Sequence, residues 1–184
     1  MKKSALLPLS AALLLSVAAL PVFAGDSLTA GTPAPAFTLP SQDNTPISLA
    51  AYKGKWVVLY FYPKDFTGGC TLEAHNFQRD LDKFTAANAV VLGVSLDTAD
   101  SHKSFCTKES LSFKLLADPN HKVVDAYGVP MKTFDNPTTH EKVTIAMRQT
   151  FLIDPSGKIV KTWDVKDIAN HSADVLAAIA AGGK

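Results

Sequence analysis

Two predominantly apolar runs restrict the fold of this chain more than any other feature of its sequence. They are Trp56–Tyr62 and Val90–Leu96. Runs of this length without polar alternation are typical of strands buried on both faces of a sheet. Between them, Phe77, Leu81 and Phe84 recur at the spacing of one helix face. A strand, a helix and a second strand in this order predict a right-handed crossover between parallel strands.

The rest of the chain extends this α/β order. Residues 25–50 contain four prolines and are expected to be extended or turning rather than helical. Residues 130–142 hold further turn formers and are expected to form an exposed excursion. Further helices are predicted over 101–109, 121–127 and 173–181, and further strands over 113–117, 150–153 and 159–163. The order predicts one domain with a central sheet of mixed direction and helices on both faces.

Composition excludes several classes of protein. Of the 184 residues, 47% are hydrophobic and 19% are charged, and the formal net charge is +1. Disordered chains combine few apolar residues with a high net charge, so this chain is expected to be folded. Nucleic-acid binders usually carry a basic excess, which is missing here. The length suits a single domain with a substantial core.

The amino terminus has the pattern of a secretory signal peptide. Lys2 and Lys3 precede an apolar run from Ala5 to about Leu20. Val22 and Ala24 then place small or branched residues at the two positions that signal peptidase recognises. We expect cleavage after Ala24, so that residues 1–24 are removed and residues 25–184 form the mature domain. The alternative is a retained membrane anchor, but the run is short and rich in alanine for a span. The mature protein is expected to be exported without stable membrane association, and a two-membrane bacterium would hold it in the periplasm.

Cys70 and Cys106 are the two cysteines, and the position of Cys70 points to chemistry. In an exported protein, two cysteines first suggest a structural disulfide. Cys70, however, opens the predicted helix that follows the first buried strand, and a thiolate at a helix amino terminus is stabilised by the unpaired N–H groups there. The glycine pair Gly68 and Gly69 permits close approach of a reacting group, and the hydroxyl of Thr67 can donate and accept hydrogen bonds.

These residues carry a resemblance to a known family. The run from Pro63 to Cys70 reads P-K-D-F-T-G-G-C, which resembles the P-x-x-x-T-x-x-C motif of peroxiredoxins. Its flanks, together with Gly31–Leu39, Ser101–Phe105 and Arg148–Asp154, resemble the bacterioferritin comigratory protein or peroxiredoxin Q branch. The resemblance covers nearly all of the chain after residue 24.

The resemblance implies a thioredoxin-like fold and a thiol peroxidase without metal or organic cofactor. Cys70 would be the peroxidatic nucleophile and would become a sulfenic acid. Thr67 and Arg148 would hold the peroxide oxygens, Pro63 would shield the site from water, and Glu73 would orient the arginine. The substrates would be hydrogen peroxide and organic hydroperoxides, the reductant a thioredoxin-like protein, and the enzyme a monomer.

Two positions depart from the family pattern. Gly68 stands where proline is usual, which predicts a looser helix start. His75 stands where many members carry a second cysteine. Cys106 lies in the third predicted helix, as in a known subset of this branch, and would be the resolving cysteine that forms a disulfide with Cys70. That bond requires Cα atoms within about 7 Å, so we expect local unwinding around both cysteines.

The sequence leaves other interpretations open. In the first, Cys106 takes no part in the reaction. In the second, the protein is a non-catalytic domain in which Cys70 and Cys106 form a structural disulfide. A disulfide oxidoreductase would need C-x-x-C, but the fourth position is Glu73. A metal site would need more ligands than His102 and Cys106, which are four residues apart. Phe66 and Phe105 could line an apolar rim or simply pack.

Overall fold

The computed structural model describes residues 28–183, so the signal peptide predicted for residues 1–24 lies outside the described residues. Its centre is a five-stranded sheet in the order β5-β4-β3-β8-β9. The strands are β3 (Trp56–Phe61), β4 (Ala89–Ser95), β5 (Lys114–Ala117), β8 (Gln149–Ile153) and β9 (Ile159–Asp164). β3, β4 and β5 run parallel, while β8 and β9 pair antiparallel. The predicted mixed sheet and parallel crossover are therefore confirmed.

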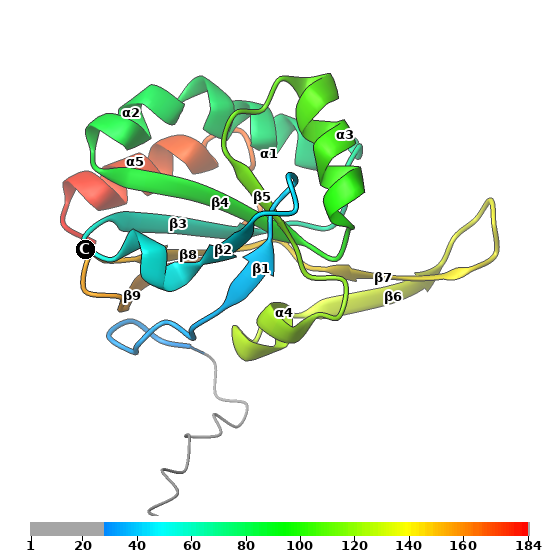
Figure 1. Cartoon of the computed structure of the whole chain (residues 1–184), viewed down its shortest axis with the longest axis horizontal. Coiled ribbons are helices and arrows are strands. Elements are labelled where there is room, and N and C mark those ends of the chain that lie inside the picture. The colour runs from blue at the N-terminus through cyan, green and yellow to red at the C-terminus, as the bar shows by residue number, and fades with distance from the viewer. Residues whose placement is uncertain (1–27, 184) are drawn as a thin grey trace, which may run out of the picture.

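Helices cover both faces of this sheet (Figure 1). One face carries α1 (Gly68–Arg79), α2 (Leu81–Ala86), α3 (Ala99–Glu109) and α5 (His171–Ala180). The other face carries α4 (Lys122–Ala126) and the short 3-10 helix η1 (Leu49–Tyr52). The side chains of β3 alternate between two cores: Val58 and Tyr60 pack with Phe77 of α1, while Leu59 packs with Val124 of α4. This alternation explains why the run 56–62 is apolar throughout.

The helix predicted to begin at Cys70 and to carry Phe77, Leu81 and Phe84 starts two residues earlier, at Gly68, and is interrupted. α1 ends at Arg79 and α2 begins at Leu81, with Asp80 between them at φ −97° and ψ 7°. The Asp80 carboxylate accepts hydrogen bonds from Arg79, Lys83 and, at 2.9 Å, from Ser172 at the start of α5. These bonds hold the junction in a non-helical geometry, so α1 and α2 lie against the sheet as two segments.

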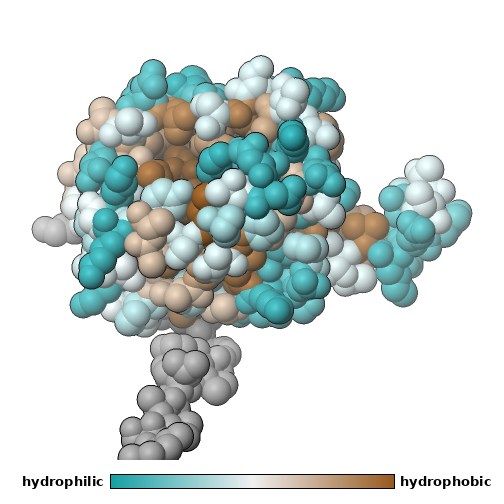
Figure 2. Space-filling model, viewed as in Figure 1, coloured by the Kyte–Doolittle hydropathy of each residue, from teal (hydrophilic) through white to brown (hydrophobic). Residues whose placement is uncertain are grey.

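The predicted excursion is exposed, and it is more regular than expected. It forms a hairpin of β6 (Met131–Asp135) and β7 (Lys142–Ala146) that projects from the domain. Figure 2 shows that the tip of the hairpin is hydrophilic and that apolar surface remains on its stem. All five residues of β6 are exposed. Because neither face of this strand is buried, its sequence shows no alternation of apolar and polar residues.

The segment before β3 is extended and turning from residue 28 to Ser48, as predicted, with a small hairpin of β1 (Thr38–Pro40) and β2 (Pro46–Ser48). The prediction fails at its end, because η1 already begins at Leu49, with the Ser48 side chain accepting a hydrogen bond from the Ala50 N–H as its cap. Within residues 28–183, none of the helices combines the length and apolar character needed to cross a bilayer.

The aromatic core positions α1 over the end of β3. The Tyr60 ring lies 4.7 Å from the Phe77 ring of α1 and crosses Gly93 of the neighbouring strand. A Cβ atom at Gly93 would lie 2.7 Å from the Tyr60 ring and 2.6 Å from Leu115, so only glycine leaves room for this packing. The predictions of Tyr60 and Phe61 as core residues are confirmed, and Trp56 is partly buried against the same core. The first turn of α1 is thereby fixed at the carboxyl end of β3.

Candidate active site at the start of α1

Cys70 lies in the first turn of α1. Thr67 has the extended geometry of an N-cap residue, at φ −92° and ψ 145°, and the Thr71 N–H donates to its carbonyl at 2.9 Å. Only 1% of Cys70 is exposed. The backbone N–H groups of a first helical turn lack intrahelical acceptors and carry partial positive charge. The sulfur therefore lies where negative charge is favoured, as the sequence predicts.

Arg148 contacts this sulfur directly. It precedes β8, whose first residue Gln149 pairs with Phe61 at the end of β3, and this register brings the arginine to the start of α1. The Arg148 Nη2 donates a hydrogen bond to the Cys70 Sγ at 3.3 Å. A Cβ on Gly69 would lie 3.3 Å from the same Nη2, so the glycine leaves space for the guanidinium. The structure thus brings together the predicted nucleophile and the predicted cation.

Glu73 holds the other side of the guanidinium. It lies one turn after Cys70 on α1, and its Oε2 accepts a hydrogen bond from the Arg148 Nη1. Burial raises the pKa of Glu73 to about 7, although the charge and hydrogen bond of Arg148 oppose this rise. The contact agrees with the expectation that Glu73 orients the arginine.

Thr67 and Pro63 lie at the mouth of the site. The Thr67 hydroxyl is exposed and donates its proton to the Lys64 carbonyl at 2.9 Å, rather than to the Cys70 sulfur. Its oxygen lone pairs remain free to accept a hydrogen bond from an incoming hydroperoxide. Pro63 is half-buried in the loop that follows β3. The structure therefore brings Arg148 and Glu73 to the cysteine but does not give Thr67 a bond to it.

Cys106 lies on α3 and, like Cys70, is a free thiol. It is 6% exposed, and burial, aided by the charge of Asp65, raises its pKa to about 12. The two cysteines belong to the same core cluster.

Sequence reasoning missed a buried polar network beside the site. The Asp65 carboxylate, in the loop before α1, bonds to His102 on α3 at 2.9 Å, to Ser101 and to Tyr62. The segments that hold Asp65 and His102 carry the family resemblance, but no local spacing indicates that the two side chains meet. Phe105 is fully buried and packs on Phe66, which is 47% exposed, so only Phe66 lies on the rim.

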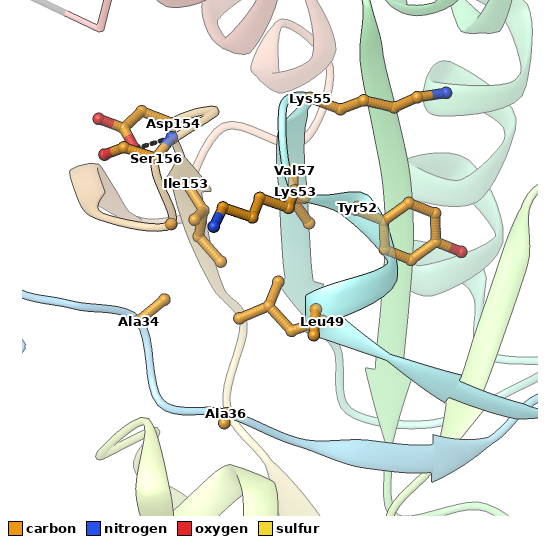
Figure 3. Close-up of a pocket in the computed structure, with 12 residues that line it drawn as sticks. Ala34, Ala36, Leu49, Tyr52, Lys53, Lys55, Val57, Ile153, Asp154 and Ser156 are labelled. Carbon is orange, nitrogen blue, oxygen red and sulfur yellow. Dashed lines mark hydrogen bonds between the residues drawn. The ribbon is translucent and has the colours of Figure 1, made fainter.

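Other places offer weaker support for a site. A pocket of about 270 Å³ lies beside Val57 and Ile153, at the opposite end of β3 from the loop that leads to Cys70. Its lining side chains are drawn in Figure 3. The Lys53 side chain extends into this space, and neither cysteine lines it. Among residues 28–183, no three His, Cys, Asp or Glu side chains gather in a group that could hold a metal ion.

Comparisons with known proteins agree on one family. A family model described as AhpC/TSA matches residues 30–162. A putative peroxiredoxin Bcp of Coxiella burnetii is 41% identical over 150 residues, which are 82% of this chain and 97% of the relative. Peroxiredoxin Bcp of Bacillus subtilis is 40% identical over 79% of this chain and 91% of its own length.

Solved structures show the same likeness. Peroxiredoxin Q of Xanthomonas campestris superposes with a TM-score of 0.71 at 38% identity, over 80% of this chain and 92% of that one. A structure of the bacterioferritin comigratory protein of the same organism, studied for its alkyl peroxide reduction activity through trapped intermediate and ligand complexes, has the same TM-score at 37% identity over the same shares.

Proposed function

The chain belongs to the AhpC/TSA family and is a thiol peroxidase of the Bcp and peroxiredoxin Q type, and we propose that it reduces hydrogen peroxide and organic hydroperoxides at Cys70. The thioredoxin-like fold expected from the sequence is confirmed. The observation that carries the assignment of the nucleophile is the hydrogen bond from Arg148 Nη2 to Cys70 Sγ at 3.3 Å.

The first step follows from this contact. The Cys70 thiolate attacks the terminal oxygen of the hydroperoxide, an S–O bond forms, and the O–O bond breaks. Cys70 becomes a sulfenic acid, and the leaving alkoxide or hydroxide takes a proton to become an alcohol or water. Arg148 is positioned to stabilise both the thiolate and the charge that develops on the leaving oxygen. No metal or organic cofactor enters this scheme.

The second step assigns Cys106 as the resolving cysteine. Its thiolate attacks the sulfenic sulfur of Cys70, a disulfide forms, and the hydroxide leaves as water. A thiol whose pKa is raised to about 12 by burial is a poor nucleophile at neutral pH, so Cys106 has to leave its buried position before it reacts. The proposal therefore includes local unwinding at α1 and α3, and a thioredoxin-like dithiol then reduces the disulfide.

The remaining residues support these steps. Thr67 accepts a hydrogen bond from the hydroperoxide, Pro63 keeps water from the thiolate, and Glu73 orients Arg148. The exposed ring of Phe66 offers an apolar contact for the alkyl group of an organic hydroperoxide, a substrate class that the work on the Xanthomonas relative names.

The proposal extends to location and assembly. The charged and apolar pattern of residues 2–24 supports export, with cleavage after Ala24 and a periplasmic location in a two-membrane bacterium. The family match begins at residue 30, after this pattern. The resemblance to this branch favours a monomer.

A peroxide-consumption assay with a thioredoxin system tests the proposal. Arg148→Lys is expected to lower the rate constant for peroxide at least tenfold, because a single ammonium nitrogen replaces the rigid fork whose Nη1 and Nη2 contact Glu73 and the sulfur separately. Cys70→Ser is expected to abolish turnover, and Cys106→Ser to stop recycling after one turnover.

Arg79→Lys is the matched control, because Arg79 is the other arginine of the chain and bonds to Asn76 and Asp80 away from the sulfur. Its rate is expected to stay within twofold of the native rate. Full activity of Cys70→Ser would overturn the mechanism.

A further inference from the structure

A buried carboxylate ties the segment before Cys70 to the helix that carries Cys106. Asp65 is 3% exposed, and its Oδ1 accepts a hydrogen bond from the Tyr62 hydroxyl at 2.7 Å. Its Oδ2 accepts from the Ser101 hydroxyl at 2.7 Å and lies 2.9 Å from His102 Nδ1. Because an ionised carboxylate can only accept, we assign the proton of this bond to Nδ1. Ser101 and His102 belong to the first turn of α3, so two of the three partners come from that helix.

The backbone of the same loop is fixed on its other side. The Asp65 N–H donates to Asp97 Oδ2 at 2.9 Å, and the same oxygen accepts from the Ser95 hydroxyl at 2.7 Å. Lys64 donates to Asp97 Oδ1 at 3.0 Å. The loop that leads to Cys70 is therefore held between the end of β4 and the start of α3.

The next residue of the loop is in a strained conformation that these bonds help to maintain. Phe66 has φ +61°, in the left-handed region that a residue with a bulky side chain rarely adopts. Its ring packs edge-on against Phe105 of α3 at 5.1 Å between centroids, with the Lys108 ammonium 5.5 Å from the ring centre. Loss of the contacts with α3 would let the loop relax to ordinary backbone angles, and Cys70 lies four residues further on.

The hydrogen bond between Asp65 and His102 explains why a histidine occupies this buried position. His102 is fully buried, and its Nε2 has no hydrogen-bond partner in the described part of the chain. A buried imidazole nitrogen without a partner is costly, so packing alone would favour an apolar residue here. Burial alone would raise the pKa of Asp65, but the bonds from His102, Ser101 and Tyr62 lower it, so the carboxylate stays charged and depends on them.

We propose that Asp65 and His102 are positioning residues, which hold Cys70 beside Arg148 and whose separation releases Cys70 and Cys106 to form their disulfide. The closed pair favours the reaction with peroxide, and the broken pair favours the resolving step. This inference rests on the resolving role of Cys106 proposed above. The hydrogen bond between Asp65 and His102 then sets the equilibrium between two conformations of the enzyme, one that reacts with peroxide and one that forms the disulfide.

Rapid-quench oxidation with thiol alkylation and mass spectrometry separates the two steps. It gives a second-order constant for Cys70 oxidation and a first-order constant for disulfide formation. His102→Leu removes the donor at similar volume and is expected to lower the first constant at least tenfold and to raise the second several-fold. His102→Asn, whose amide offers a donor near the Nδ1 position, is expected to restore both constants to within threefold of native.

Two control variants exclude a general loss of stability. His121→Leu breaks an exposed histidine–aspartate pair on α4, in which His121 Nδ1 lies 2.6 Å from Asp125 Oδ2, and both constants are expected to stay native. Val124→Ala opens a space in the opposite core and is expected to lower the melting temperature without changing the ratio of the two constants. Ser101→Ala removes one hydrogen bond to Asp65. Like His102→Leu, it is expected to slow Cys70 oxidation and to speed disulfide formation, but by smaller factors. If His102→Leu does not fold, the two constants of Ser101→Ala test the proposal instead.

The proposal is overturned if both constants fall together in His102→Leu, if neither changes, or if Val124→Ala shifts the ratio equally. A native protein that turns over peroxide without forming the 70–106 bond would instead contradict the proposed resolving role. In that case the rate of Cys70 oxidation alone decides whether the pair positions the nucleophile.

Discussion

Arg148 divides its guanidinium between two acidic partners, and this division defines the site at the scale of single residues. Nη2 contacts the Cys70 sulfur and Nη1 contacts the Glu73 carboxylate. Burial raises the pKa of Glu73 to about 7, against the opposing charge and hydrogen bond of Arg148. The Glu73 carboxyl can therefore gain a proton near neutral pH. The Cys70 thiolate is then the one anionic partner of Arg148 in this contact.

The raised pKa of Glu73 predicts a pH dependence of stability. A carboxyl whose pKa is higher in the folded than in the unfolded chain destabilises the fold as it ionises, so stability falls as pH rises from 4.5 towards 7 and then levels. Glu73→Gln removes this slope. In urea titrations of the reduced protein between pH 5 and pH 8, we expect the native chain to lose about 2–3 kcal/mol relative to the variant. Equal slopes for the two proteins would contradict the raised pKa.

At the scale of elements, the five central strands were predictable because their causes are local. The run 56–62 is apolar at every position, and the run 90–96 is interrupted only by Gly93 and Ser95. The glycine pair marks the start of α1 to within two residues, because the helix begins at Gly68 rather than at Cys70. The break at Asp80 was not predictable, because it depends on a bond from Ser172, 92 residues away. The hairpin of β6 and β7 was predicted only as an exposed excursion. β6 is exposed along its whole length and has no hydrophobic period, and the alternation of β7, Lys-Val-Thr-Ile-Ala, is the one local signal that could have indicated a strand.

The helix start provides a prediction at this scale. Gly68 is the first residue of α1, a Cβ there would meet no atom within 4 Å, and Thr67 before it has the extended angles that proline requires of its predecessor. Gly68→Pro is therefore expected to raise the free energy of unfolding by about 0.4–1 kcal/mol and to slow disulfide formation several-fold. Urea titration and quenched oxidation measure the two effects.

Gly69→Ala is the matched comparison for this change. Its Cβ would lie 3.3 Å from Arg148 Nη2, so it is expected to slow the oxidation of Cys70 rather than the formation of the disulfide. Faster disulfide formation in Gly68→Pro would contradict the view that unwinding of this turn limits the second step.

At the scale of the whole molecule, the site forms where three distant parts of the chain meet: the end of β3 with α1, the residue before β8, and α3. The motif around Cys70 and the position of Arg148 allowed the sequence to identify the first two parts through family resemblance. The contact of Asp65 with His102 spans 37 positions and follows no local pattern, so only the folded structure reveals it. His75 Nε2 likewise lies 3.0 Å from Glu109 Oε2 of α3, which adds a polar contact between the two cysteine-bearing helices.

The most direct measurement is peptide mapping of the reduced protein after one equivalent of hydrogen peroxide, with free thiols alkylated before digestion. We expect a peptide pair joined by a bond between Cys70 and Cys106, and in Cys106→Ser a sulfenic acid on Cys70 that dimedone labels. Consumption of the peroxide with Cys70 recovered as an alkylated, unoxidised thiol would show that Cys70 is not the nucleophile.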